Sequence, residues 1–310
     1  MKSVVMFLIV AVCAGFGVPS GNVSLQYKFK PGEEYEYVQR SKQNAVQVLP
    51  GMGEMKMDGT LGGTMLLKIK SVDEKGTARI ETQYTKLKML THSFIMSMSM
   101  DSDGPEEEDG NKIMKALTGK TFFFLLTKTG KVEAVEGVEN LYSGLASLDL
   151  DADVVSKAQK TLKQTINEKS IKTLLENGLV SYPENPVKAG DSWNTSSVQA
   201  VNFPMTIENT WNLKSADGGV AVVSCKGDLK TIDKDKVNNL VNGMKSKSDL
   251  NGTQTMHANV DVKTGWPKDV KIVSDLKGTM TLLAGGMIPQ DMEIPMTVKI
   301  ETDYSIVKKK

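Results

Sequence analysis

Three short motifs occur twice in this chain of 310 residues, in the same order. The matched pairs are Lys30–Tyr35 (KPGEEY) with Lys188–Trp193 (KAGDSW), Ile69–Asp73 (IKSVD) with Leu213–Asp217 (LKSAD), and the KTG segments 128–130 and 263–265. Such a repeat limits the chain to folds made of two similar halves. We therefore predict that residues 21–310 form a single β-rich domain, with repeat copies 25–136 and 180–310 joined by a helical segment, 137–179.

The residues around these motifs predict strands and tight turns. Gly32 and Gly190 precede apolar alternation, and glycine accepts the positive φ that such turns require. In Met65–Lys70, positions 65, 67 and 69 face one way and Lys68 and Lys70 the other, which suits a sheet with one wet face. Trp211 and Leu213 occupy the places of Leu67 and Ile69 in the second copy. The predicted fold is mainly β (α+β): a curved antiparallel sheet or half-barrel built from a two-copy repeat, with helices packed in or against it.

Helical spacing of apolar residues appears between the copies. A run from Asp151 ends at Gly178 with a glycine stop, and a shorter helix is predicted over 233–244. Amphipathic helices bury one face, and we expect the concave side of the sheet to cover it. The acidic segment Asp101–Asn111 lacks large apolar residues and is predicted to be a mobile, solvated loop.

The first residues have the order of a secretory signal. Lys2 precedes the apolar run Val4–Val12 and a small-residue stretch, so residues 1–20 are predicted to be a removable signal peptide. The uncharged apolar run is shorter than the roughly 20 residues that span a bilayer. A lipid-anchored alternative at Cys13 is disfavoured because Val12 stands where that signal has a small residue. An exported, periplasmic or extracellular protein follows, with Cys225 as its only cysteine and no internal disulfide.

Charge and motif content disfavour several classes of function. With 38 basic and 37 acidic residues the chain lacks the excess charge of a nucleic-acid binder. Common catalytic, zinc and phosphate-binding motifs do not occur in the sequence. We interpret the two histidines, His92 and His257, as ordinary strand residues. The sequence therefore predicts no enzyme, no metal site and no cofactor.

Methionine is abundant, with 18 residues, and part of it is patterned. Met96, Met98 and Met100 alternate along one predicted strand and so share a face. Flexible thioethers fill irregular cores, line cavities for apolar ligands, or bind Cu(I) as soft ligands. All three interpretations stay open at the level of sequence.

The segments Phe29–Tyr37 (FKPGEEYEY) and Asn185–Trp193 (NPVKAGDSW) resemble a family of uncharacterised secreted bacterial proteins. Their shared residues are turn and strand signatures, so the resemblance implies a fold and no activity. A curved antiparallel sheet with helices in its hollow also resembles, by architecture alone, the LolA-like lipoprotein-carrier half-barrels. That resemblance implies a hollow that holds acyl chains.

Together these observations predict a non-catalytic envelope protein, peripheral to the membrane at most, that binds an apolar ligand in a sheet-and-helix hollow. The ligand would be a lipid or a lipidated partner. The candidate lining residues are Leu67, Ile69, Met96, Met98, Met100, Trp211 and Leu213. Two alternatives remain: a structural or protein-interaction module with a solid core, and methionine-based Cu(I) binding.

Overall fold

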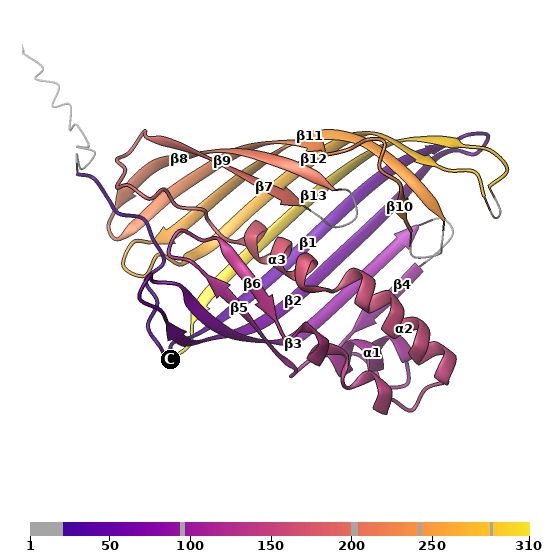
Figure 1. Ribbon diagram of the computed structural model, residues 1–310, viewed down its shortest axis with the longest axis horizontal. Coiled ribbons are helices and arrows are strands. Elements are labelled where there is room, and N and C mark those ends of the chain that lie inside the picture. The colour runs from indigo at the N-terminus through magenta and orange to yellow at the C-terminus, as the bar shows by residue number, and fades with distance from the viewer. Residues whose placement is uncertain (1–20, 94–96, 200–203, 241–243, 286–287) are drawn as a thin grey trace, which may run out of the picture.

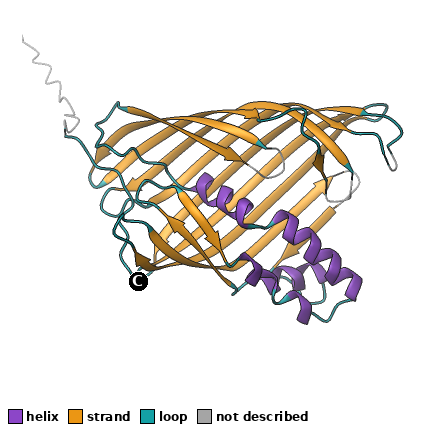
Figure 2. Cartoon of the chain, in the orientation of Figure 1, coloured by secondary structure: helices purple, strands orange, loops and turns teal. Residues whose placement is uncertain are grey.

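The computed structural model describes residues 21–310, except 94–96, 200–203, 241–243 and 286–287. The predicted signal peptide and Met96 therefore lie outside the described residues. Over the described part, antiparallel strands form one large curved sheet, and helices lie on its concave side (Figures 1 and 2). This arrangement confirms the predicted fold class.

The strands are β1 (Glu34–Leu49), β2 (Gly53–Val72), β3 (Ala78–Ser93), β4 (Ser97–Asp101), β5 (Thr121–Leu126), β6 (Val132–Glu136), β7 (Ser192–Gln199), β8 (Met205–Asp217), β9 (Val220–Thr231), β10 (Asn238–Asn239), β11 (Lys245–Asp261), β12 (Pro267–Leu282) and β13 (Met292–Lys308). The helices are α1 (Asp109–Leu117), α2 (Ala152–Thr165) and α3 (Glu168–Gly178), with short 3-10 turns η1 (Val138–Tyr142) and η2 (Leu145–Ser147).

The strand order across the sheet repeats itself. It runs β6-β5-β3-β2-β1, then β13, then β12-β11-β9-β8-β7, with β4 beside β3 and β10 beside β11. The first predicted copy contributes β6-β5-β3-β2-β1, and the second contributes β12-β11-β9-β8-β7. Numbered from the start of its own copy, each set is the sixth, fifth, third, second and first strand, and β13 lies between the two sets. The two predicted copies thus occupy successive parts of one sheet.

The repeated motifs also make matching contacts. Gly32 has φ +88° and Gly190 has φ +93°. The Gly32 amide donates to the Ile69 carbonyl at 2.8 Å, and the Gly190 amide donates to the Leu213 carbonyl at 2.8 Å. The register of each strand pair then shifts at the equivalent place, after Ile69 in β2 and after Leu213 in β8. A duplication explains this match, although the division into copies 25–136 and 180–310 stays a prediction.

The main core lies between the sheet and α3. Ile171 and Leu175 on α3 belong to the same buried cluster as Tyr37 on β1 and Tyr304 on β13. The Tyr37 and Tyr304 rings lie 5.6 Å apart between centroids. Burial of this helix face fixes α3 against the concave side of the sheet, which therefore becomes the inner face.

Two helix predictions need correction. The run from Asp151 to Gly178 is broken into α2 and α3, because Asn167 starts a new helix through a capping box with Ser170. The helix predicted over 233–244 is wrong within the described residues. There Asn238 and Asn239 form β10 and pair with β11, so pairing with a neighbouring strand overrides the apolar spacing.

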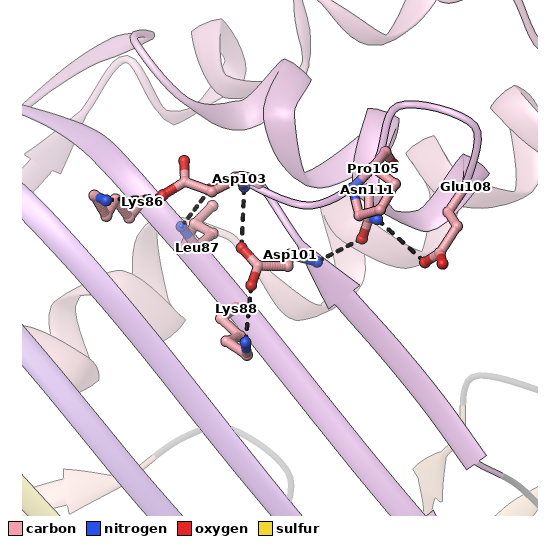
Figure 3. Close-up of polar contacts among 9 residues, drawn as sticks. Lys86, Leu87, Lys88, Asp101, Asp103, Pro105, Glu108 and Asn111 are labelled. Atoms are coloured by element: carbon pink, nitrogen blue, oxygen red, sulfur yellow. Dashed lines mark hydrogen bonds and ion pairs between the residues drawn. The ribbon is translucent and has the colours of Figure 1, made fainter.

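The acidic segment Asp101–Asn111 contains an exposed loop, as predicted, but its two ends belong to β4 and α1. Asp101 ends β4 and forms an ion pair with Lys88 on β3 at 2.9 Å. Asn111 is buried in the first turn of α1, and its Oδ1 accepts a hydrogen bond from the Asp101 amide at 2.7 Å. Figure 3 shows these contacts holding the segment against β3. Hydrogen bonds and ion pairs thus hold both ends of a segment that lacks large apolar side chains.

Candidate ligand-binding site between α3 and the sheet

A cavity of about 680 Å³ lies between α3 and the inner face of the second half of the sheet. We call it the α3 cavity. It is lined by Thr129, Gly130, Lys131, Lys169, Lys172, Thr173, Glu176, Asn177, Ser181, Tyr182, Thr195, Ser196, Ser197, Val198, Gln199, Asn209, Trp211, Leu229, Gln254, Met256, Ile272, Ser274, Leu276, Ile300, Thr302 and Tyr304. Ligand sites in proteins commonly enclose about 300–1,000 Å³, so its size suits a small molecule.

Apolar side chains form a large part of the cavity wall. They come from inner-face positions of β8, β9, β11, β12 and β13: Trp211, Leu229, Met256, Ile272, Leu276, Ile300 and Tyr304. Strand alternation places these side chains on the same face as the buried core. The Trp211 indole Nε1 donates to Thr195 Oγ1 at 2.8 Å, which fixes the ring in the wall.

A polar row crosses this apolar wall. Successive inner-face partners on neighbouring strands are Thr195 and Asn209, Asn209 and Gly227, Gly227 and Gln254, and Gln254 and Ser274. Gln254 Nε2 donates to Asn209 Oδ1 at 2.9 Å. All of these residues except Gly227 line the cavity. The wall can therefore contact both an apolar chain and a polar group attached to it.

Cys225 lies beside the polar row, two residues before Gly227 on β9, and is a poor nucleophile. Its thiol is buried and donates to Asn209 Oδ1 at 3.3 Å. Burial raises the pKa of the Cys225 thiol to about 12. The reactive thiolate is therefore scarce at neutral pH.

Basic side chains rim the cavity beside α3. Lys131, Lys169 and Lys172 line it together with one acid, Glu176. Lys172 Nζ lies 4.0 Å from Glu176 Oε1, and the same carboxylate oxygen accepts the Val132 amide at 3.3 Å. Burial raises the pKa of Glu176, while Lys172 opposes that shift. Three lysines against one acid give the rim an excess of positive charge.

The predicted lining residues separate into three groups: Trp211, three residues of the main core, and the methionines of β4 and the segment before it. Trp211 lines the α3 cavity, whereas Leu67, Ile69 and Leu213 are at most 1% exposed in the main core. These four share one buried cluster.

The predicted methionine stripe lies elsewhere. Met98 and Met100 are half-buried on β4, and Met100 packs beside α1. Met96 falls outside the described residues, so the structure does not bring the stripe to the cavity. Whether any of these side chains contacts a ligand stays a prediction.

Sequence reasoning missed the polar row. Asn209, Gln254 and Ser274 stand at inner-face positions of otherwise apolar strands, and Gly227 interrupts β9 between them. The available signal was a polar residue at an inner-face position in each of several strands. Only the strand pairing shows that the residues form one row.

The described residues contain neither a cluster of metal-ligand side chains nor a helix that could span a membrane. No group of three or more His, Cys, Asp or Glu within the described ranges is placed to hold a metal ion. In the same part of the chain, no helix has the length and apolar character needed to cross a membrane.

An open, curved antiparallel sheet with helices on its concave side defines the class of this protein. Residues 75–267 match the family of unknown function DUF6263. That match spans more than half of the chain, which therefore belongs to this family. No curated protein matches the sequence.

One solved structure, lipovitellin, shows a similar fold. The chain is similar to lipovitellin with a TM-score of 0.50 and 11% identity, over 91% of this chain and 26% of the lipovitellin chain. It thus spans about a quarter of the lipovitellin chain, and the likeness shows the fold alone. An outer membrane channel from Pseudomonas putida F1 gives a TM-score of 0.27 at 8% identity, over 91% of this chain and 97% of the channel.

Proposed function

We propose that this protein is a non-catalytic, exported protein that binds an apolar ligand in the α3 cavity. The ligand is a lipid or the acyl chain of a lipidated partner. The observation that carries the proposal is a cavity of about 680 Å³ whose sheet side carries apolar side chains from β8, β9, β11, β12 and β13 and lies beside the core of the molecule.

The chemistry of the wall supports an amphiphilic ligand. Each CH₂ group that leaves water for the apolar wall gains about 0.8 kcal/mol. The polar row offers amide and hydroxyl groups through Gln254 and Ser274. An acyl chain can therefore lie on the wall while its ester or amide group meets the polar row.

The same wall supports binding without catalysis. The Cys225 thiol stays protonated because burial raises its pKa to about 12. Neither His92 nor His257 is among the residues that line the cavity. The hydroxyl groups of Thr195 and Ser274 thus have no histidine beside them to act as a general base.

Lipovitellin provides a parallel for the ligand class. Its structure was described for lipid–protein interactions, and a sheet of this shape is compatible with such a ligand. The signal-like residues 1–20 support export to the periplasm or the cell exterior, where lipid transfer takes place beside the membrane.

The test uses the neutral apolar probe N-phenyl-1-naphthylamine with the protein lacking residues 1–20. We expect saturable fluorescence enhancement, displaced by palmitate. Ser274→Phe places a ring in the cavity and should weaken probe binding by about tenfold or more. Thr255→Phe is the matched control, since Thr255 is exposed on the opposite face of the neighbouring strand.

Native mass spectrometry of protein purified from its own host supplies a second measurement. Adducts of lipid mass on the wild-type protein, absent from Ser274→Phe, support the proposal. Equal probe binding by Ser274→Phe and Thr255→Phe, or no binding by the wild type, contradicts it. Circular dichroism of both variants shows whether the fold is kept.

A further inference from the structure

The β7 strand ends the sheet without the charged residues or prolines that often protect edge strands. Over the described residues, β7 pairs with β8 alone. Its sequence, SWNTSSVQ, contains no charged residue and no proline. Val198 is 52% exposed on this strand. Natural sheets usually protect such edges with lysine, proline, bulges or a covering element, because an exposed edge pairs with other chains.

The opposite edge of the sheet shows the contrast. β6 has only five residues and carries Glu133 and Glu136. α3 packs beside it, and Glu176 on α3 accepts the Val132 amide at 3.3 Å. β6 is thus short, charged and covered. The β7 edge differs from it in being longer and uncharged.

The α3 cavity runs along the backbone of β7. Four consecutive residues, Thr195–Val198, line it. Side chains alternate between the two faces of a strand, so one face alone cannot present four consecutive residues. The residues share the strand edge, which carries backbone N–H and C=O groups. The cavity therefore presents hydrogen-bonding groups in the pattern that a further strand would use.

Charge on the other side of the cavity indicates what kind of strand fits. Lys131, Lys169 and Lys172 face the same space as β7, with Glu176 as the single acid there. A strand added at β7 would project its side chains towards this rim. Acidic side chains at alternate positions would therefore meet an excess of lysine.

We propose that the edge of β7 at Thr195–Val198 binds an extended, acidic peptide segment of a partner protein by strand addition. A segment of about eight residues would match the length of β7, because paired strands both advance by about 3.4 Å per residue. This interaction goes beyond the binding of an apolar ligand, and it does not require one. It uses the backbone of Thr195–Val198 and the lysine rim.

The test uses the chain without residues 1–20 and a pool of fluorescein-labelled peptides. Each peptide has about ten residues, with Glu alternating with Val, Ile or Thr. One matched set carries Lys in place of Glu. A second set keeps the side chains but is N-methylated on alternate residues, which removes the backbone donors of one edge. Fluorescence anisotropy gives the affinities, and hydrogen exchange locates the site.

We expect Glu peptides to bind and to protect the amides of β7 but not those of β6. N-methylation should weaken binding by about tenfold or more, since main-chain hydrogen bonds supply the affinity. The Lys169→Gln/Lys172→Gln double variant should weaken binding by about threefold to tenfold at low salt. Lys271→Gln/Lys277→Gln is the matched control, because both lysines are exposed on the outer face of β12.

Three results would overturn the proposal. The first is that no Glu peptide binds. The second is that N-methylated peptides bind as well as their parents, which would mean side-chain attraction alone. The third is that β7 becomes protected on raising the protein concentration without peptide, which would assign the edge to a second copy of the chain. Probe binding by N-phenyl-1-naphthylamine remains a separate measurement of the apolar site.

Discussion

Gln254 on β11 reaches Asn209 on β8 across the intervening strand, with Nε2 donating to Oδ1 at 2.9 Å. The two strands are separated by β9, and the hydrogen bond passes over Gly227. A Cβ atom on Gly227 would lie 2.7 Å from Gln254 Cγ and would overlap Asn209 Oδ1. The glycine in the middle of β9 therefore makes room for the polar wall of the α3 cavity.

Gly227→Ala should destabilise the protein and disturb the cavity. The added methyl group must displace the Asn209 or Gln254 side chain, and overpacking of this kind costs about 1–3 kcal/mol. Urea unfolding measures the loss. The same variant should weaken probe binding in the α3 cavity, because the displaced amide moves into the space beside Ser274.

A double-mutant cycle identifies the cause. In an Asn209→Ala/Gln254→Ala background the side chains that meet the new methyl group are gone, so Gly227→Ala should cost about 1 kcal/mol less. An equal cost in both backgrounds would show that strain in the β9 backbone, and not the hydrogen-bonded pair, governs the effect.

The alternating strands and their turns could be predicted from the sequence because both signals are local. Gly32 and Gly190 adopt positive φ as their motifs indicate, and the side-chain parity in β2 and β8 follows from residue type. The site was harder to predict. Alternation predicts that Leu213 and Trp211 lie on the same face of β8. It does not predict which positions along that face are in the core and which line a cavity. Leu213 lies in the core, whereas Trp211 reaches the cavity.

The acidic segment was predicted only in part, for a related reason. Composition predicts that few apolar contacts hold Asp101–Asn111, which is correct. It carries no information about Lys86 and Lys88 on β3, whose ion pairs with Asp103 and Asp101 measure 2.8 and 2.9 Å. Order here depends on a neighbouring strand that only the folded sheet supplies.

Gly178→Ala should destabilise the junction of α3 with the sheet. Gly178 is the last residue of α3, and a Cβ atom there would overlap the Tyr37 hydroxyl and lie 2.8 Å from Tyr304 Cε1. Both rings are buried, so neither can move without opening the core. We expect a loss of about 1–3 kcal/mol in urea unfolding.

Gly59→Ala is the control for this substitution. Its nearest neighbour would be the Leu90 carbonyl at 3.7 Å, an ordinary contact. Its effect should be neutral or a gain of up to about 1 kcal/mol, because alanine restricts the unfolded chain. Equal losses for the two variants would contradict the close packing of α3 on Tyr37.

Asn111→Ala should release the segment between β4 and α1. The buried amide accepts the Asp101 N–H at 2.7 Å and donates to the Pro105 carbonyl at 2.9 Å and to Glu108 Oε2 at 3.1 Å. Its removal takes away the acceptor of the Asp101 N–H and one donor to the Pro105 carbonyl, at a cost of about 1–3 kcal/mol. Hydrogen exchange should become faster across this segment. Asn194→Ala, on the exposed face of β7, should change neither exchange nor stability.

The tyrosines should make the fold sensitive to alkali. Burial raises the pKa of all seven, and Tyr84 reaches about 12. The others are Tyr27, Tyr35, Tyr37, Tyr142, Tyr182 and Tyr304. Since the folded pKa values lie above the unfolded value of about 10, tyrosine burial contributes fully below pH 10 and loses its contribution as the pH rises further.

Tyrosinate absorbance during an alkaline titration checks this expectation. We expect little tyrosinate up to about pH 10, then one cooperative rise that coincides with loss of the β signal in circular dichroism. In denaturing guanidinium the same residues should titrate independently near pH 10. The Cys225 thiol adds to the loss in the same direction, because its pKa is raised from 9.0 to about 12. Gradual ionisation of most tyrosines near pH 10 with the sheet intact would mean that the phenol groups around Tyr37 are open to water.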